Sequence, residues 1–397
     1  MKSELKIVIF DGSFKTRPFI NTVIKSLCEK HQIYVLGFDT RVDEKIKGVK
    51  YIDLGTQSNK LNLLWRSLVF SFKNLYKSGV FSDFFELLKL ITHIDASGLK
   101  HFNFNLALKQ IRPNIVHVQW ISLLPYCETI LKENSYNVVL SQLGYQLNVR
   151  PFVEAENEAY LKTLFPGIRG FHSVSEAIKE KSNVLYASPS KIDKVIYSGF
   201  NFNKFPSICS YKKTDALQLI SVGRPHWIKG YDYMIKACKD LKNNGVNFHY
   251  TIIGAKGNEE VAYMINDFNL QDYVTVTDSI PQKEVYQLMA NSNLLVLPSI
   301  AEGIANVIIE AMAIGLPVLS TRCGGVVELV TDNETGFLVP IRDASALSKK
   351  IQDFDTLSIE KINALRMNAR EKVEQNHNIT KMTADFEDLY YECLKHK

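Results

Sequence analysis

Two glutamates eight positions apart, Glu302 and Glu310, are the side chains best suited to chemistry in this sequence. They frame a segment, 303–315, whose apolar pattern and terminal glycine predict a helix. On a helix, residues eight apart are separated by roughly 12 Å along the axis and by about 80° around it. A glycoside-hydrolase pair needs carboxyl groups within roughly 5 to 9.5 Å, so a shared acid and base pair is disfavoured. The two acids are instead predicted to contact one elongated ligand at two places.

A second candidate lies about seventy residues earlier, where four residues separate Gly223-Arg224 from Lys229-Gly230. The segment 217–222 reads as a strand, and a helix is expected to follow and to end near 241. Anions bind at such strand-to-helix turns because backbone N–H groups point at the ligand. Arginine offers a planar fork and lysine a mobile point charge, which together suit a diphosphate.

The elements that position these residues read as an α/β fold. Strand, helix and strand alternate from 5–10 onward in the first half, and again from 217–222 in the second. We expect a first domain at 1–198, a linker at 199–215 and a second domain at 216–378. The last helix, 379–397, is expected to cross back to the first domain. A long helical insertion is predicted at about 61–111.

Composition excludes several classes of protein. The 397 residues are 46% hydrophobic and 22% charged, as in ordinary globular proteins. No run approaches the roughly eighteen apolar residues of a transmembrane helix, and no signal peptide is recognised. The cysteines show no CxxC pair or Cys/His cluster, which favours reduced thiols and a cytoplasmic location. Their positions are Cys28, Cys127, Cys209, Cys238, Cys323 and Cys393.

Charge is distributed unevenly along the chain. Residues 1–200 hold 26 Lys and Arg against 18 Asp and Glu, a net of +8, so the rest of the +5 chain carries −3. The basic first half is expected to meet an anionic surface or a phosphorylated acceptor. Within the insertion, basic residues outnumber acidic ones: Lys60, Arg66, Lys73, Lys77, Lys89, Lys100 and Lys109 against Asp83, Glu86 and Asp95.

Two interpretations of the insertion remain open. Its aromatic, basic and amphipathic helices fit peripheral contact with the inner face of a membrane. The same apolar face can equally pack on the core of the first domain, which is the commoner use of such a helix.

The whole stretch 298–339, PSIAEGIANVIIEAMAIGLPVLSTRCGGVVELVTDNETGFLV, resembles the nucleotide-binding half of the retaining GT-B glycosyltransferases, in the family with two Glu separated by seven residues (glycosyltransferase family 4, group 1). The resemblance implies two Rossmann-like doubly wound domains facing a cleft. It also implies transfer of a sugar from a UDP- or GDP-sugar with retention at the anomeric carbon and without a metal ion or other cofactor.

The resemblance also assigns roles to residues of this sequence. Arg224 and Lys229 would bind the diphosphate, Glu302 the hydroxyls of the donor sugar and Glu310 those of the ribose. The remaining donor-binding candidates are Gly223, Gly303, Ile304, Ala305, Asn306 and Val307 around the phosphates and sugar, and Ser279 and Ile280 around the base. A metal motif is suggested only by Asp353-Phe354-Asp355, which we attribute to chance.

The first domain departs from the family pattern. Its first loop has only Gly12 where paired glycines are usual, and the side chains of Lys15 and Arg17 are expected to compensate. In the loop after 138–143, Gln146, Asn148 and Arg150 are the candidates for contacts with the acceptor. His117 is expected to be a packed, hydrogen-bonded histidine.

The partners expected are therefore a nucleotide sugar and a glycan or lipid-linked oligosaccharide, in surface polysaccharide biosynthesis. A GT-B epimerase or a glycosyl phosphorylase shares the architecture and remains an alternative. A non-enzymatic or nucleic-acid-binding module would need a basic aromatic surface without a phosphate pocket, and no nucleic-acid partner is expected.

Overall fold

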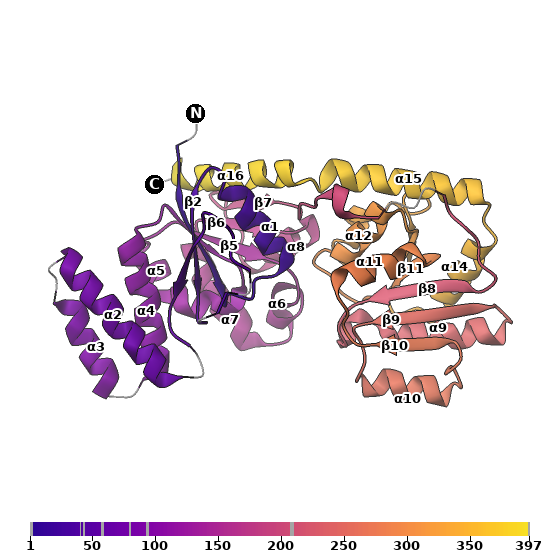
Figure 1. Cartoon of the computed structure of the whole chain (residues 1–397), viewed down its shortest axis with the longest axis horizontal. Helices are drawn as coiled ribbons and strands as arrows, with labels where there is room; N and C mark the ends of the chain where they lie inside the picture. The colour runs from indigo at the N-terminus through magenta and orange to yellow at the C-terminus, as the bar shows by residue number, and fades with distance from the viewer. Residues whose placement is uncertain are drawn as a thin grey trace. The chain divides into compact units, whose positions relative to one another are not determined.

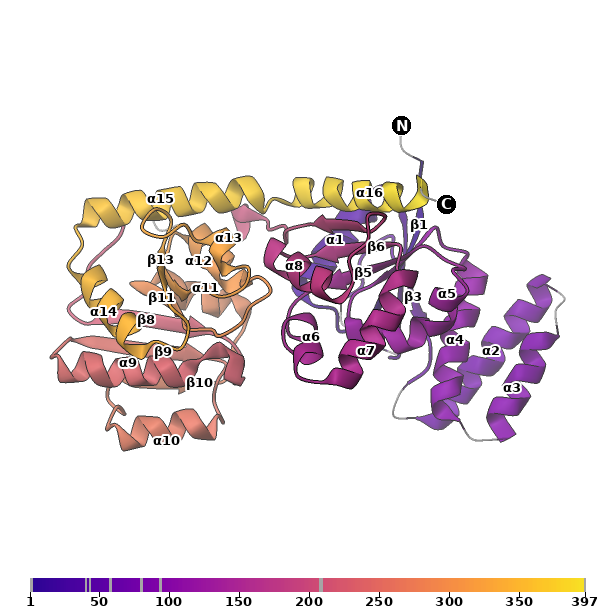
Figure 2. The same ribbon diagram turned by 180° about the vertical axis from the view of Figure 1, so that it is seen from behind.

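The computed structural model describes residues 3–39, 41–42, 44–56, 59–78, 81–92, 95–206 and 210–395. The chain forms two compact units. The N-terminal unit contains Met1–Val174, Lys179–Gly199 and Ile379–Lys397, and the C-terminal unit contains Ser175–Ile178 and Phe200–Asn378. The ribbon is shown from two sides in Figures 1 and 2.

The N-terminal unit is built on a seven-stranded parallel sheet with the order β3-β2-β1-β4-β5-β6-β7. The direction in which the chain adds strands reverses between β1 and β4, where ligands bind in open α/β sheets. The strands are β1 (Lys6–Gly12), β2 (Gln32–Gly37), β3 (Lys50–Asp53), β4 (Ile115–Val118), β5 (Val138–Gln142), β6 (Gly170–Ser173) and β7 (Ile192–Val195).

Helices cover both faces of this sheet (Figure 1), as parallel strands require because their connections cross over the sheet. They are α1 (Pro18–Leu27), α2 (Lys60–Ser78), α3 (Ser82–Thr92), α4 (Ala96–Ile111), α5 (Glu128–Lys132), α6 (Tyr145–Asn148), α7 (Ala155–Leu164), α8 (Glu176–Leu185) and α16 (Ile379–Lys395). Short 3-10 turns are η1 (Ile121–Cys127), η2 (Arg150–Phe152) and η3 (Phe165–Gly167).

The C-terminal unit has a six-stranded parallel sheet with the order β10-β9-β8-β11-β12-β13, which reverses between β8 and β11. Its strands are β8 (Leu217–Val222), β9 (Phe248–Ile253), β10 (Val274–Thr277), β11 (Leu294–Leu297), β12 (Val318–Thr321) and β13 (Phe337–Val339). Its helices and 3-10 turns are η4 (Phe202–Lys204), η5 (Trp227–Lys229), α9 (Tyr231–Asn243), α10 (Glu259–Asp267), α11 (Gln282–Ala290), α12 (Asn306–Ile314), α13 (Val326–Leu329), α14 (Ala344–Asp355) and α15 (Ile359–Asn376). The predicted class, two doubly wound α/β units, is confirmed.

The last helix, α16, packs on the sheet of the N-terminal unit through Met382, Phe386 and Leu389. A hydrogen bond of 2.7 Å joins the hydroxyl of Tyr390 to Nδ1 of His117 on β4. Burial lowers the pKa of His117 well below its usual value. His117 is therefore the packed, hydrogen-bonded histidine that its sequence position predicted.

The helical insertion consists of α2, α3 and α4. Helix α4 buries Phe104 against Phe10 of β1, with ring centroids 4.6 Å apart, so this helix packs on the core. Helices α2 and α3 lie beyond α4 from the sheet in both views (Figures 1 and 2) and keep large apolar side chains exposed. The prediction of packing on the core therefore holds for α4, whereas α2 and α3 are packed on one face only.

Some sequence-based predictions concern residues outside the described part. They are residues 207–209 of the expected linker, which include Cys209, and the side chain of Lys77. Residues 200–206 and 210–215 fold with the C-terminal unit, where Phe205 lies in the core. Cys28, Cys127, Cys238, Cys323 and Cys393 are free thiols. Among the described helices, none combines the length and apolar character needed to cross a bilayer.

Candidate functional site

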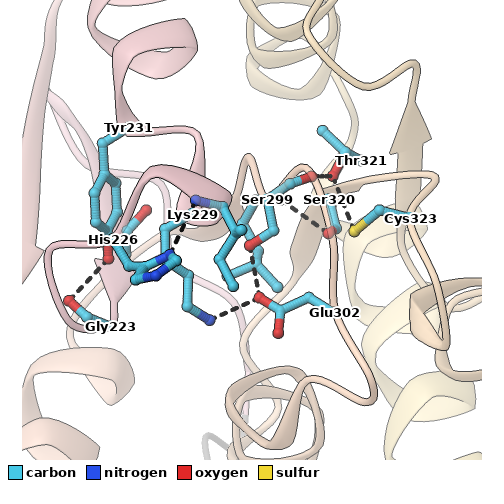
Figure 3. Close-up of polar contacts among 12 residues, drawn as sticks. Gly223, His226, Lys229, Tyr231, Ser299, Glu302, Ser320, Thr321 and Cys323 are labelled. Carbon is cyan, nitrogen blue, oxygen red and sulfur yellow. Dashed lines mark hydrogen bonds and ion pairs between the residues drawn. The ribbon is translucent and has the colours of Figure 1, made fainter. Parts of the chain in front are cut away.

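The candidate site of the C-terminal unit lies at the carboxyl edge of its sheet, where the turns after β8, β11 and β12 meet (Figure 3). After β8, the chain passes through Gly223 and the 3-10 turn η5 into α9. Tyr231, in the first turn of α9, donates a hydrogen bond of 2.9 Å to the carbonyl of Gly223. Gly230 has φ +63°, and a Cβ added there would lie 2.2 Å from the carbonyl oxygen of Pro298. The turn after β8 is therefore pressed directly onto the loop after β11.

The loop after β11 carries Glu302. Ile300 N donates to the carbonyl of Ile228 at 2.7 Å, which ties this loop to η5. The prediction that the helix begins at residue 303 is wrong, because α12 begins at Asn306, with Ala305 as its N-cap. Glu302 thus precedes the helix by four residues, so the helical spacing inferred between Glu302 and Glu310 does not apply. The amides of Gly303 and Ile304 belong to this loop and not to the first helical turn.

The turn after β12 shapes the same loop from the other side. Gly324 has φ +47°, and a Cβ at this position would lie 1.9 Å from the carbonyl oxygen of Glu302. A Cβ on Gly325 would lie 2.2 Å from the carbonyl oxygen of Gly303. The same oxygen accepts a hydrogen bond of 2.7 Å from the hydroxyl of Ser175. The paired glycines seen in the sequence let the two backbones touch, which fixes the path of the chain at Glu302.

Lys229 and Glu302 form an ion pair at the centre of this arrangement (Figure 3). Nζ of Lys229 lies 2.6 Å from Oε1 of Glu302, and only 17% and 10% of the two side chains are exposed. The hydroxyl of Ser299 donates to the same oxygen at 2.7 Å. Removing either partner of a charged pair with so little exposure would leave the other charge poorly solvated, so the two side chains hold each other in place. Sequence reasoning gave these two residues separate roles, and the structure brings them into direct contact.

Glu310 is held separately, on α12. Its carboxylate accepts two hydrogen bonds from α11, one of 2.8 Å from Nε2 of Gln282 and one of 3.2 Å from the hydroxyl of Tyr286. Burial raises the pKa of Glu310 to about 7, and the two hydrogen bonds oppose that rise. The ionised carboxylate is thus under-solvated and has a residual capacity to accept hydrogen bonds from a ligand.

The remaining basic residue, Arg224, is exposed at the start of the turn after β8. His226 accepts a weak hydrogen bond of 3.4 Å from Ile228 N, and burial together with the nearby positive charges of Arg224 and Lys229 lowers its pKa. A neutral histidine between two cations leaves the turn available to an anion.

The candidates expected near a base follow β10. Ser279 is exposed and Ile280 is partly buried against the core. A Cβ on Gly254, after β9, would lie 3.5 Å from Oγ of Ser279 and 3.2 Å from the carbonyl oxygen of Gly223. The ends of β8, β9 and β10 therefore meet, and Ser279 lies near the site.

The first turn of α12 is suited to a polar ligand. Ala305 has no side-chain oxygen, so it provides no side-chain cap for the N–H groups of this turn. Oδ1 of Asn306 is buried, and no residue of the described ranges donates a hydrogen bond to it. Ile304 and Val307 are partly buried against the core and shape the apolar edge of the turn.

The candidates of the N-terminal unit are less closely grouped. Oε1 of Gln146 accepts a hydrogen bond of 3.1 Å from the backbone N–H of Ser122, which connects Gln146 to η1 after β4. Arg150 pairs at 2.9 Å with Glu154 one turn later. Lys15 is exposed and Asn148 partly buried. The expected loop over 144–152 is wrong, since α6 and η2 occupy it.

A buried carboxylate that the sequence analysis missed lies where the strand order of this unit reverses. Asp11 is the next-to-last residue of β1, and its carboxylate accepts a hydrogen bond from the indole N–H of Trp120, two residues after β4. Burial raises the pKa of Asp11 to about 7. The signal in the sequence was a lone acid at the end of an apolar strand.

Several supporting residues of the C-terminal site were also missed: Ser175, Gln282, Tyr286 and Ser299. Each is distant in sequence from the group that it contacts, or of a common type in a loop, so no local pattern marked it. Within the described ranges, no three His, Cys, Asp or Glu side chains are grouped so as to hold a metal ion.

Part of the chain is similar in sequence to known glycosyltransferases. Residues 210–372 match the family model described as "Glycosyl transferases group 1". A putative colanic acid biosynthesis glycosyltransferase of Escherichia coli K12, WcaL, is 36% identical over 169 residues, 41% of this chain and 42% of that protein. The amylovoran biosynthesis glycosyltransferase AmsK of Erwinia amylovora is 38% identical over 139 residues, 33% of this chain and 34% of that protein. These matches thus span less than half of either relative.

The fold is matched over nearly the whole chain. The crystal structure of Anabaena HepE in complex with UDP-glucose matches with a TM-score of 0.71 and 17% sequence identity. The match covers 97% of this chain and 99% of that one. This likeness confirms the GT-B fold that the sequence predicted.

Replacing Gly324 by Ala tests the positioning of Glu302. In general, a residue with a Cβ at a positive φ destabilises the folded state by about 1 to 2 kcal/mol. The collision of this Cβ with the carbonyl oxygen of Glu302 would destabilise it further. We expect Gly324→Ala to lower the free energy of unfolding in urea by about 3 kcal/mol or more. Gly257→Ala is the matched control, because Gly257 has φ +85° and no described atom lies within 4 Å of an added Cβ. Equal losses in the two variants would contradict the proposed contact.

Proposed function

We propose that this chain transfers a sugar from a nucleotide diphosphate to an acceptor hydroxyl, with retention of anomeric configuration, because residues 210–372 match the model of the group 1 glycosyl transferases. The observation that carries the proposal is the contact of Lys229 with Glu302 where the strand order of the C-terminal sheet reverses. Doubly wound sheets bind nucleotides at this place. The pair joins a group suited to a phosphate with one suited to sugar hydroxyls.

The basic groups are proposed to stabilise the leaving diphosphate. When the bond from the anomeric carbon to the diphosphate oxygen breaks, negative charge collects on the phosphates. Lys229, Arg224 and the first turn of α12 supply positive charge and N–H groups without needing reorganisation. The acceptor oxygen forms the new bond from the leaving-group side, and its proton passes to the departing diphosphate. These groups suit a mechanism that requires no metal ion.

Glu302 and Glu310 are proposed to bind the two ends of the donor, the sugar and the ribose. Glu302 accepts hydrogen bonds from hydroxyls of the sugar while it keeps Lys229 oriented, and Asn306 Oδ1 gains a donor from the ligand. Glu310 accepts from the ribose hydroxyls, with Gln282 and Tyr286 fixing its carboxylate. Ser279 and Ile280 border the base, and Gly223, Gly303, Ile304, Ala305 and Val307 line the phosphate and sugar positions.

The identity of the donor and acceptor is proposed at the level of chemical class. HepE was solved with UDP-glucose, which supports a UDP-sugar, and a GDP-sugar is the other candidate. The names of WcaL and AmsK refer to colanic acid and amylovoran biosynthesis, which supports a glycan or lipid-linked acceptor in surface polysaccharide biosynthesis. In the N-terminal unit, Lys15, Gln146 and Asn148 are proposed to contact the acceptor. Arg150 contributes only if it leaves Glu154.

The other parts of the proposal concern organisation and location. We propose an acceptor-binding domain at 1–198, a donor-binding domain at 216–378, a linker between them and a C-terminal helix at 379–397. The protein is proposed to act in the cytoplasm, with its basic N-terminal unit in peripheral contact with the inner face of the membrane.

The direct test is a panel of nucleotide sugars in a thermal-shift assay. A ligand that binds only the folded protein raises the melting temperature with its concentration. A UDP- or GDP-sugar should stabilise the protein, and the stabilising donor should then support transfer to a glycan acceptor. If no member of either series shifts the melting temperature, the proposal is wrong.

Removing the amine of Lys229 should mainly reduce catalysis. Lys229→Ala leaves the developing charge on the diphosphate less stabilised, so we expect kcat/KM to fall by about 10²- to 10³-fold. Lys236→Ala is the control, because Lys236 is on the exposed side of α9 and pairs with Asp232 one turn away. The control should keep full activity. A loss of less than threefold in Lys229→Ala would refute its role.

Donor binding should depend on the protonation of Glu310. Its pKa lies at about 7 because burial disfavours the charge, and ribose hydroxyls donate to the ionised form. Affinity is therefore gained as pH rises through about 7 and lost as pH falls below it. By calorimetry, the Kd of the stabilising nucleotide sugar should increase about five- to tenfold between about pH 8 and pH 6. Glu310→Gln should bind weakly and independently of pH. An unchanged pH dependence in that variant would assign the titration elsewhere.

Chelation gives an independent check on the proposed charge stabilisation. If Lys229, Arg224 and the first turn of α12 balance the diphosphate charge, excess EDTA should change the initial rate by less than about twofold. Activity that disappears with EDTA and returns with Mg²⁺ or Mn²⁺ would show that a cation takes this role.

A further inference from the structure

Helices α2 and α3 expose a group of large apolar side chains that the donor site does not use. We call it the α2–α3 aromatic face and define it as Trp65, Phe72 and Tyr76 of α2, Phe81 directly before α3, and Phe85 and Leu88 of α3. Their exposed fractions run from 46% for Leu88 to 93% for Tyr76. Soluble monomers rarely expose so many large apolar side chains together without an interaction that uses them.

The six residues share one side of each helix. At 100° per residue, Trp65, Phe72 and Tyr76 lie within about 40° of one another around α2. Phe81, Phe85 and Leu88 lie within about 60° around α3 by the same rule. The ring of Phe72 contacts that of Phe84, next to Phe85, with centroids 6.0 Å apart. The two stripes therefore adjoin, on helices that lie side by side in both ribbon views (Figures 1 and 2).

The opposite sides of both helices are fully used within the protein. Leu63 and Phe70 of α2 and Leu87 of α3 are buried. The buried carboxylate of Asp83 pairs with Lys109 of α4 at 2.8 Å. These contacts fix the two helices on α4, so the exposed side is not a misplaced core face. It faces outward on helices whose other sides are packed.

The charges nearby select the kind of partner. Residues 60–92 contain five Lys and Arg against two Asp and Glu, and the first 200 residues carry a net +8. Lys73 is exposed on α2 beside the aromatic face. Tryptophan, tyrosine and phenylalanine with flanking lysines are the residues that favour the headgroup region of a bilayer. A second copy of the chain would instead oppose like charges across a symmetric contact.

We propose that the α2–α3 aromatic face docks on the surface of a bilayer that contains anionic lipids. The aromatic rings enter the headgroup region, and Lys73 and its basic neighbours meet the lipid phosphates. This surface specifies where the basic N-terminal unit meets a membrane. It does not depend on which donor or acceptor the C-terminal unit uses.

The test is co-sedimentation of the full chain with vesicles of phosphatidylglycerol and phosphatidylethanolamine. Wild-type protein should sediment with these vesicles, less with pure phosphatidylcholine and less at high salt, because screening weakens the lysine contacts. The triple variant Trp65→Ser, Phe72→Ser, Phe85→Ser should lose at least about tenfold in partition coefficient. The control Tyr263→Ser, Met367→Ser removes apolar side chains that are 70% and 71% exposed in the C-terminal unit, and should bind as wild type does.

Two further measurements keep the outcome clear. Trp65 fluorescence should shift to the blue on addition of vesicles, and the shift should be absent in Trp65→Phe, which retains Trp120 and Trp227. The rise of the melting temperature with nucleotide sugar should be unchanged in the triple variant, since its substitutions lie in the N-terminal unit at exposed positions.

The proposal is overturned if wild-type protein does not bind anionic vesicles, or if the Tyr263 and Met367 control loses binding as much as the triple variant. It is also overturned if sedimentation equilibrium shows a dimer that the triple variant abolishes while vesicles have no effect. That result would assign the face to a second copy of the chain. Failure to stabilise with nucleotide sugars, by contrast, would affect only the proposed transfer.

Discussion

The candidate donor site depends on the contact between two turns that are far apart in sequence, through the ion pair of Lys229 and Glu302. The pair is nearly buried, so it persists only because the backbone brings both groups together and Ser299 satisfies a further hydrogen bond. Its carboxylate belongs to the loop that leads into α12. A ligand that enters here finds a cation and an acceptor already oriented, which reduces the entropy cost of ordering them.

Backbone proximity makes this contact possible. The turn after β8 touches the loop after β11 at Gly230, and the turn after β12 touches the same loop at Gly324. A side chain at either place would push the loop outward and separate Glu302 from Lys229. The site is therefore built by three turns at one edge of a sheet. Each strand contributes a short connection, and the reversal of strand order between β8 and β11 leaves room for a ligand.

The N-terminal unit repeats this topology with different chemistry. Its strand order also reverses, between β1 and β4, and there a buried acid, Asp11, is held by Trp120. The turn after β1 is less rich in glycine, and the basic side chains around it remain exposed. The large addition to this unit is the helical insertion, of which α4 completes the core while α2 and α3 present apolar side chains outward. The same segment thus serves packing and exposure on opposite faces, which is why its pattern alone supported both interpretations.

The sequence by itself determined the alternation of strands and helices, the location of the basic turn at Gly223 to Gly230, and the pair Glu302 and Glu310. Those features depend on local patterns: apolar runs, glycines at turns and the order of charged residues along the chain. Only the tertiary structure decided that α12 begins at Asn306, that Lys229 contacts Glu302, and that Gln282 and Tyr286 hold Glu310. It also revealed Asp11 beside Trp120 and the outward side of α2. These depend on which strand ends become neighbours in the sheet and on which helix faces find a packing partner, and such long-range contacts leave no local signal in the sequence.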